Sequence, residues 1–140
     1  MSYLVDTNVL SELRRKTPDA RVVRWFLHRP AQSLFLSVLT LGELRKGIEL
    51  LPRSARRLAL LDWLEGEIPA YFSGRILPVD ADAADHWGHM LARAGRPIPA
   101  VDGLLAASAH RHGLTFVTRN VRDVRGLGVA VLDPWSLDEA

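Results

Sequence analysis

Short apolar runs alternate with amphipathic stretches along the whole chain. Five runs contain no charged residue, and each is three to five residues long: Tyr3–Val5, Leu34–Val38, Ile76–Val79, Thr115–Val117 and Val129–Leu132. Continuous apolar runs are typical of parallel strands in a sheet that helices cover on both faces. The pattern therefore predicts a buried parallel sheet.

Apolar residues at helical spacing occupy the segments between these runs. A helix that packs on a core repeats its apolar residues roughly every three or four positions. Four stripes have this spacing: Val22, Val23, Phe26 and Leu27; Leu58, Leu61, Leu64 and Ile68; Ala84, Trp87, Leu91 and Ala94; and Val101, Leu104, Leu105, Ser108 and Ala109. Prolines fall at the joints between the predicted elements. We therefore expect one α/β domain over residues 1–140, with helices packed around the sheet.

The composition excludes several classes of protein. A chain of 140 residues, 48% hydrophobic and 24% charged, can bury a core and is not disordered. No apolar run approaches the roughly 20 residues that span a bilayer, and the N-terminus lacks the pattern of a signal peptide. The absence of cysteine excludes disulfides, thiolate metal sites and cysteine nucleophiles. We expect a cytoplasmic protein that does not bind membranes.

Four acidic residues follow apolar runs or open helical stretches. Asp6 ends the first run, Glu43 follows the second, Asp102 stands near the start of the last stripe, and Asp123 follows the fourth run. Positions just past the carboxyl ends of parallel strands converge on one crevice. Several carboxylates in one crevice repel each other unless a hard cation joins them. The sequence therefore predicts a site for Mg²⁺ or Mn²⁺.

Each acid also has a purely structural explanation. Asp6 is a favoured N-cap residue, and Glu43 completes a capping box with Thr40. Asp102 suits the first turn of a helix, and Asp123 is an ordinary turn residue. One shared site accounts for all four residues more economically than four separate reasons.

The basic residues are nearly all arginine, although the net charge is only +2. Arginine offers a planar fork that binds phosphate through two donors. Three clusters occur: Arg14-Arg15-Lys16, Arg53-Arg56-Arg57 and Arg119-Arg122-Arg125. Solvated helix faces are the alternative explanation for each cluster. Because the last cluster brackets Asp123, we expect Arg119 and Arg122 to contact a phosphate group of a bound ligand near the site.

Four segments together resemble the successive motifs of PIN-domain proteins, in particular the VapC and FitB group of bacterial toxin–antitoxin ribonucleases. These segments are Asp6–Glu12, Thr40–Leu44, Pro99–Ala107 and Thr118–Asp123. The resemblance covers nearly the whole chain, including the closing Leu132–Trp135. It implies a three-layer α/β/α sandwich with a central parallel sheet. It also implies a Mg²⁺- or Mn²⁺-dependent endoribonuclease that acts as the toxin of a type II pair, forms a homodimer and binds a small antitoxin.

Carried over by position, the resemblance assigns an acidic quartet and four supporting polar residues. The quartet is Asp6, Glu43, Asp102 and Asp123, and the supporting residues are Thr7, Asn8, Thr118 and Asn120. Mg²⁺ usually takes only one or two protein carboxylates directly. We expect Asp6 and Asp102 to bind it directly, with Glu43 and Asp123 acting through water or on a second ion. Two positions depart from the family: Asn120 stands where an acid is frequent, and Val124 replaces an aromatic residue.

Two surfaces follow as expectations. The candidate dimer patch comprises Leu58, Leu61, Trp63, Leu64 and Tyr71-Phe72, and an antitoxin helix is expected around Leu10, Leu13, Val22 and Phe26. An antitoxin arginine entering the acidic crevice would neutralise it.

Three other classes of protein compete with a nuclease. A magnesium-binding phosphoacceptor receiver domain needs a late lysine, and the chain has none after Lys46. A Rossmann module needs a glycine-rich first turn, where this chain reads Asp6-Thr7-Asn8-Val9. A non-catalytic PIN-like binding protein stays open as an alternative.

Overall fold

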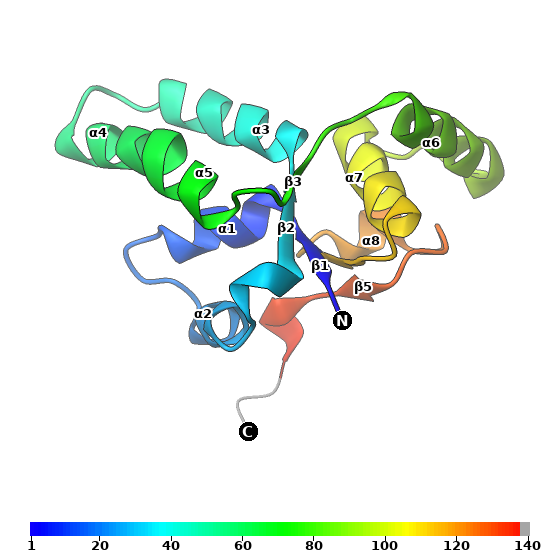
Figure 1. Ribbon diagram of the computed structural model, residues 1–140, viewed down its shortest axis with the longest axis horizontal. Helices are drawn as coiled ribbons and strands as arrows, with labels where there is room; N and C mark the ends of the chain where they lie inside the picture. Colours follow the sequence, from blue (N-terminus) through cyan, green and yellow to red (C-terminus); the bar gives the residue numbers. More distant parts are fainter. Residues whose placement is uncertain (138–140) are drawn as a thin grey trace.

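A fully parallel, five-stranded sheet forms the centre of the molecule (Figure 1). The computed structural model describes residues 1–137. The strand order is β3-β2-β1-β4-β5. The strands are β1 (Tyr3–Val5), β2 (Leu34–Ser37), β3 (Ile76–Leu77), β4 (Thr115–Val117) and β5 (Val131–Leu132). Leu4 lies in register with Phe35 of β2 on one side and Phe116 of β4 on the other.

Helices cover both faces of this sheet, with α1 to α5 on one side and α6 to α8 on the other (Figure 1). The helices are α1 (Thr7–Leu13), α2 (Ala20–Leu27), α3 (Val38–Glu49), α4 (Ala55–Asp62), α5 (Ile68–Tyr71), α6 (Ala81–Ala94), α7 (Ala100–Arg111) and α8 (Val121–Val124). A π-helical turn over Trp63–Glu67 joins α4 to α5, and 3₁₀ turns span Ala31–Ser33 and Pro134–Ser136. The predicted three-layer α/β/α architecture is confirmed.

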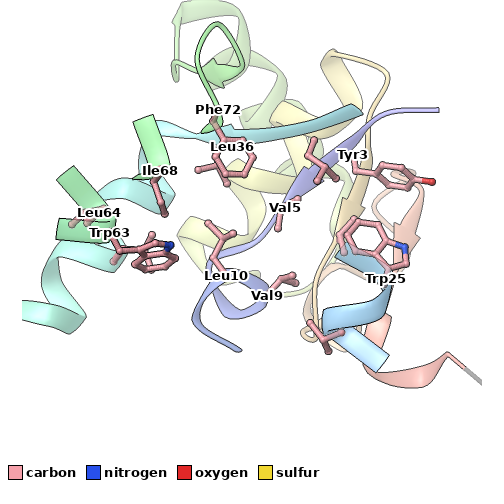
Figure 2. Packing of buried hydrophobic residues seen from close by; sticks show 14 of the residues in the cluster. Tyr3, Val5, Val9, Leu10, Trp25, Leu36, Trp63, Leu64, Ile68 and Phe72 are labelled. Carbon is pink, nitrogen blue, oxygen red and sulfur yellow. The ribbon is translucent and has the colours of Figure 1, made fainter. Parts of the chain in front are cut away.

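The strands divide their side chains between two cores. Tyr3, Val5 and Leu36 point into the core beneath α1 to α5, where Leu36 lies beside Phe72 and Tyr3 packs against Trp25 (Figure 2). On the opposite face, Leu4 and Phe116 pack against α6, α7 and α8. Side chains of a strand alternate between the faces of its sheet, so the three-residue strand β1 contributes to both cores.

All five predicted strands exist, but three are shorter than predicted. Val38 is the first residue of α3, β3 ends at Leu77, and β5 begins at Val131. Helices α1 and α3 were not among the predicted stripes, because their apolar residues are few and interrupted by polar ones. Ser37 caps α3, its Oγ accepting a hydrogen bond from the Leu39 amide at 3.1 Å. Thr40 is therefore inside the helix, and the capping-box explanation of Glu43 is wrong.

The second stripe is not one continuous helix. It is split by the π-helical turn, and α5 carries Pro69 in its first turn. A proline lacks the amide hydrogen that a regular helix would use, which loosens the turn before it. Leu58 of this stripe is 64% exposed, and Leu27 of the first stripe is 74% exposed. The stripe pattern predicted burial, which is wrong for Leu27, whereas Leu58 also belongs to the candidate dimer patch, which requires it to be exposed in one protomer.

The chain enters a helix directly at the carboxyl end of β1 and of β2. Asp6 follows β1 and caps α1, its Oδ1 accepting a hydrogen bond from the Thr7 amide at 2.7 Å. Helix α7 brings its first turn to the same edge and packs closely on α6. A Cβ atom at Gly103 would lie only 3.0 Å from Nε1 of Trp87, so this close approach favours glycine. Within residues 1–137, no helix combines the length and apolar character needed to cross a membrane.

Candidate metal centre

Asp6 lies at the centre of the site and is almost completely buried. Its side chain is only 3% exposed, although it carries a carboxylate. Oδ2 accepts hydrogen bonds from Oγ1 of Thr118 at 2.7 Å and from Nδ2 of Asn8 at 3.3 Å. The Asp6 amide donates to the carbonyl oxygen of Val117 at 2.9 Å, which fixes the start of α1 against the end of β4. Asp6 is therefore held both by α1 and by the chain at the end of β4.

The surroundings of Asp6 oppose its ionisation. Burial raises its pKa from 3.8 to about 6, and the charges of Asp102 and Glu43 act in the same direction. The hydrogen bonds from Thr118 and from the Thr7 amide act the other way and favour the carboxylate. A nearby positive charge would favour the carboxylate much more strongly than these neutral donors do.

Glu43 reaches the site from the second turn of α3, where it is exposed. Its Oε1 accepts a hydrogen bond from Oγ1 of Thr7 at 2.5 Å. The Thr7 hydroxyl also lies 3.3 Å from Oγ1 of the fully buried Thr40. Thr40 therefore supports the site, a role that its capping-box interpretation concealed.

Asp102 enters from the first turn of α7. Burial raises its pKa, and the charges of Asp123 and Glu43 add to that shift, while a hydrogen bond from the Asn120 side chain lowers it. Asp123 of α8 is thus a close neighbour of Asp102. Asn120 and Asp123 therefore both lie beside the same carboxylate.

A crevice of about 480 Å³ opens above these residues. This acidic crevice is lined by Asp6, Thr7, Asn8, Ser11, Glu12, Arg15, Glu43, Asp102, Arg119, Asn120 and Trp135. Thr118 lies below it and bonds to Asp6, and Asp123 lies behind Asp102, outside the lining. Of the two predicted RNA-binding arginines, Arg119 lines the crevice, with its guanidinium carbon 5.0 Å from the Trp135 ring centre, and Arg122 does not.

Sequence reasoning missed four residues of the lining: Ser11, Glu12, Arg15 and Trp135. Glu12 is only 4% exposed and accepts hydrogen bonds from Nη1 of Arg15 at 3.2 Å and from the Asp19 amide at 2.9 Å. One signal for Glu12 was available. It lies three residues after the buried Val9 of α1, so an acid occupies the apolar face of that helix.

The side chains of the site suit a hard divalent cation. Asp6, Glu43 and Asp102 offer only oxygen, which Mg²⁺ and Mn²⁺ prefer, and the repulsion among them is relieved by positive charge. Within residues 1–137, no three acidic or histidine side chains already have the arrangement of a complete metal site. Mg²⁺ keeps several of its waters, so one or two carboxylates are enough to hold it.

The fold and the crevice define an α/β/α protein with a carboxylate-lined site at the carboxyl edge of its parallel sheet. The family model of the PIN domain matches residues 3–125. The chain belongs to the PIN-domain family. This assignment removes the receiver-domain and Rossmann alternatives.

Two curated relatives and two solved structures place the chain within that family. It is similar to the VapC ribonuclease Y4jK of Sinorhizobium fredii, with 36% identity covering 94% of this chain and 96% of that protein. Toxin FitB of Neisseria gonorrhoeae is 39% identical, covering 94% and 97% of the two chains. The crystal structure of FitAcB from that organism has a TM-score of 0.92 over 96% of this chain and 99% of that one. VapBC-5 of Mycobacterium tuberculosis, from the VapBC family of toxin–antitoxin systems, has a TM-score of 0.63 at 26% identity over 94% and 95%.

The buried charge of Asp6 predicts how stability depends on pH without metal. The folded protein binds the Asp6 proton with a pKa of about 6, against 3.8 for a freely solvated aspartic acid side chain. Binding of this proton stabilises the folded state fully at pH values below the lower pKa. The stabilisation is lost as the pH rises through the higher pKa, which lowers the free energy of unfolding by about 3 kcal/mol. We expect Asp6→Asn to melt at a higher temperature than the parent at about pH 8, and at a similar temperature at about pH 4.

Thermal melts in chelator, monitored by circular dichroism across this pH range, measure the effect. Asp62→Asn, at an exposed position of α4, is the matched control and should follow the parent. A parent that is as stable as Asp6→Asn at the higher pH would contradict the buried-charge argument.

Proposed function

We propose that the protein is a divalent-metal-dependent endoribonuclease and the toxin of a type II toxin–antitoxin pair. The observation that carries the proposal is the buried Asp6, surrounded by two further carboxylates at the edge of a parallel sheet. Such a site is unfavourable alone and favourable with a hard cation. The names of the relatives, a VapC ribonuclease and a toxin, support this function.

Each side chain then has a chemical task. Asp6 and Asp102 would bind Mg²⁺ or Mn²⁺ directly, and Glu43 and Asp123 would act through water or on a second ion. A bound cation supplies a lower pKa for its water and offsets charge that develops on the phosphate. Thr118 and Asn8 hold the Asp6 carboxylate, and Thr7 holds Glu43 toward the crevice. Arg119, stacked on Trp135, would bind a phosphate oxygen of the RNA.

Cleavage of a single-stranded RNA in Mg²⁺ or Mn²⁺ tests this proposal directly. We expect excess EDTA to abolish cleavage, and Asp102→Asn to lower it by roughly 100-fold or more, since the amide keeps the shape but loses the charge. Asp85→Asn, in the second turn of α6 and highly exposed, is the control that should keep parental activity.

Undiminished ribonuclease activity in chelator would reject the metal mechanism. A folded parent that binds metal but never cleaves RNA would instead favour the non-catalytic binding protein.

A homodimer is part of the proposal, with a revised contact surface. Trp63, Leu64 and Phe72 of the predicted patch belong to the main core, so we do not expect them to supply the dimer contact. Leu58 of the same patch is 64% exposed on α4, and Leu50 at the end of α3 is 76% exposed. Exposed apolar surface of this kind commonly marks an interface.

Sedimentation at micromolar concentration measures the dimer. We expect the parent to sediment as a dimer and Leu58→Glu to shift toward monomer, because a charge would be desolvated in the interface. Leu27→Glu introduces the same charge at an equally exposed leucine of α2 and should remain dimeric. A monomeric parent would refute the homodimer.

An antitoxin is the proposed partner, and the structure offers it an apolar hollow of about 190 Å³. Its lining consists of Leu10, Leu13, Phe26, Trp63, Glu67, Ile68, Tyr71 and Phe72. Three of the four residues expected to contact an antitoxin helix lie there, and the fourth, Val22, is fully buried. An amphipathic helix would cover this hollow, and an arginine from the same chain would enter the acidic crevice and bind its carboxylates.

Co-expression with the neighbouring gene tests this inhibition. We expect it to restore growth, and the purified pair to cleave RNA much more slowly than the free protein. Leu13→Glu should weaken the pair, because it places a charge in the apolar hollow, whereas Leu137→Glu should not. A tight pair that cleaves as fast as the free protein would show that the inhibition model is wrong.

A further inference from the structure

We propose that a second hollow beside the acidic crevice binds the RNA strand on one side of the cleaved bond, with Arg14 and Arg56 as its phosphate-binding residues. This inference rests on the proposed ribonuclease function and adds to it a path for the substrate. The hollow has a volume of about 150 Å³. Its lining consists of Ser11, Arg14, Glu43, Leu44, Gly47, Ile48, Leu51, Arg56, Leu60 and Trp63. We refer to this pocket as the arginine hollow.

The arginine hollow and the acidic crevice adjoin each other. Ser11 of α1 and Glu43 of α3 line both of them. A strand whose phosphate occupies the crevice would pass Ser11 and Glu43 to reach the arginine hollow. The hollow is a natural continuation of the catalytic site.

Two arginines far apart in the sequence meet in this hollow. Arg14 ends α1 and Arg56 lies in the first turn of α4, 42 residues later. Nη2 of Arg56 donates a hydrogen bond to the carbonyl oxygen of Arg14 at 3.0 Å. The Arg14 guanidinium carbon lies 5.4 Å from the Trp63 ring centre. The fold thus joins the first two arginine clusters of the sequence at one point.

The two positive charges have no acidic partner within residues 1–137. The next arginine of the second cluster differs, because Nη2 of Arg57 lies 2.6 Å from Oε2 of Glu49. Arg14 and Arg56 form no such ion pair in that part of the chain. Two neighbouring like charges without a counterion favour an anion between or beside them. Phosphate oxygens fit guanidinium groups well, because the planar fork donates two parallel hydrogen bonds.

The remaining lining favours single-stranded nucleic acid over a simple anion. Leu44, Ile48 and Leu60 form an apolar floor beside the arginines. A nucleotide presents both a phosphate and an apolar base face, and bases stack on guanidinium planes in single-stranded RNA recognition. Arg14 lies over the Trp63 ring and is half-buried, so a base stacked on its guanidinium would extend this arrangement. The combination matches one or two nucleotides next to the cleaved bond.

RNA binding by Arg14→Gln/Arg56→Gln tests this inference. Binding of a labelled single-stranded oligonucleotide is measured against salt concentration, with Asp102→Asn present in every protein to prevent cleavage. We expect affinity to fall by about tenfold or more, and the slope of log K against log salt to decrease by about 1.4, from two lost phosphate contacts at about 0.7 each. Arg24→Gln/Arg53→Gln removes two exposed arginines outside the hollow and is the matched control.

Two further measurements separate phosphate binding from a structural role. Arg14→Lys/Arg56→Lys keeps both charges and should restore most of the salt slope, although not the stacking. In a cleavage assay, the parent and Arg14→Gln/Arg56→Gln are compared without the Asp102→Asn change. Shortening the RNA on one side of a fixed cleavage point should abolish the difference between their cleavage rates. Melting curves identify any variant that is unfolded, in which case the single Arg14→Gln and Arg56→Gln variants take its place.

The outcomes divide clearly. An unchanged affinity and salt slope in the glutamine variant overturns the inference, while RNA cleavage by the parent still upholds the proposed function. A variant that loses the dimer or the antitoxin but binds RNA normally shows that the hollow is a protein interface, and this also overturns the inference. A parent that neither binds nor cleaves RNA defeats the proposed function and the inference together.

Discussion

The structure is organised around the burial of one carboxylate, Asp6. A charge that is 3% exposed at the end of a central strand is costly unless neighbouring groups favour it. Thr118, Asn8 and the Thr7 amide supply hydrogen bonds, yet burial still raises the Asp6 pKa to about 6. Neutral donors therefore do not complete the site. A bound cation, as proposed for this site, would offset the remaining cost of the buried charge.

The strand order explains how distant residues reach Asp6. Strand β1 lies between β2 and β4, so the segments that follow these two strands flank the end of β1. Thr118 follows β4 directly and binds Asp6 across 112 positions of sequence, while α3 follows β2 and carries Glu43. Asp102 comes from α7 in the opposite helical layer. Both layers must pack correctly before the carboxylates can meet.

Sequence patterns predicted the features of this arrangement that depend on residues close together in the chain. Apolar runs located all five strands, and acids at strand ends pointed to one crevice, which contains Asp6, Glu43 and Asp102. The patterns failed where tertiary packing decides the outcome. Nothing in the sequence after Leu58 signals that α4 gives way to a π-helical turn at Trp63. The contact between Arg14 and Arg56 likewise depends on how α1 and α4 pack, which no spacing in the sequence encodes.

The segregation of charge has a consequence for inhibition. The net charge is only +2, yet four carboxylates line the crevice, together with Arg15 and Arg119, while Arg14 and Arg56 line the hollow beside it with Glu43 between the two. In the proposed function, RNA phosphates would be bound by the arginines and, through a cation, by the acids. An arginine from a protein partner would bind only the carboxylates of the crevice. It carries one positive charge, whereas the cation that it would displace carries two. Inhibition by that arginine alone would be weak at high metal concentration, so the apolar hollow near Phe26 and Tyr71 has to supply much of the partner's affinity.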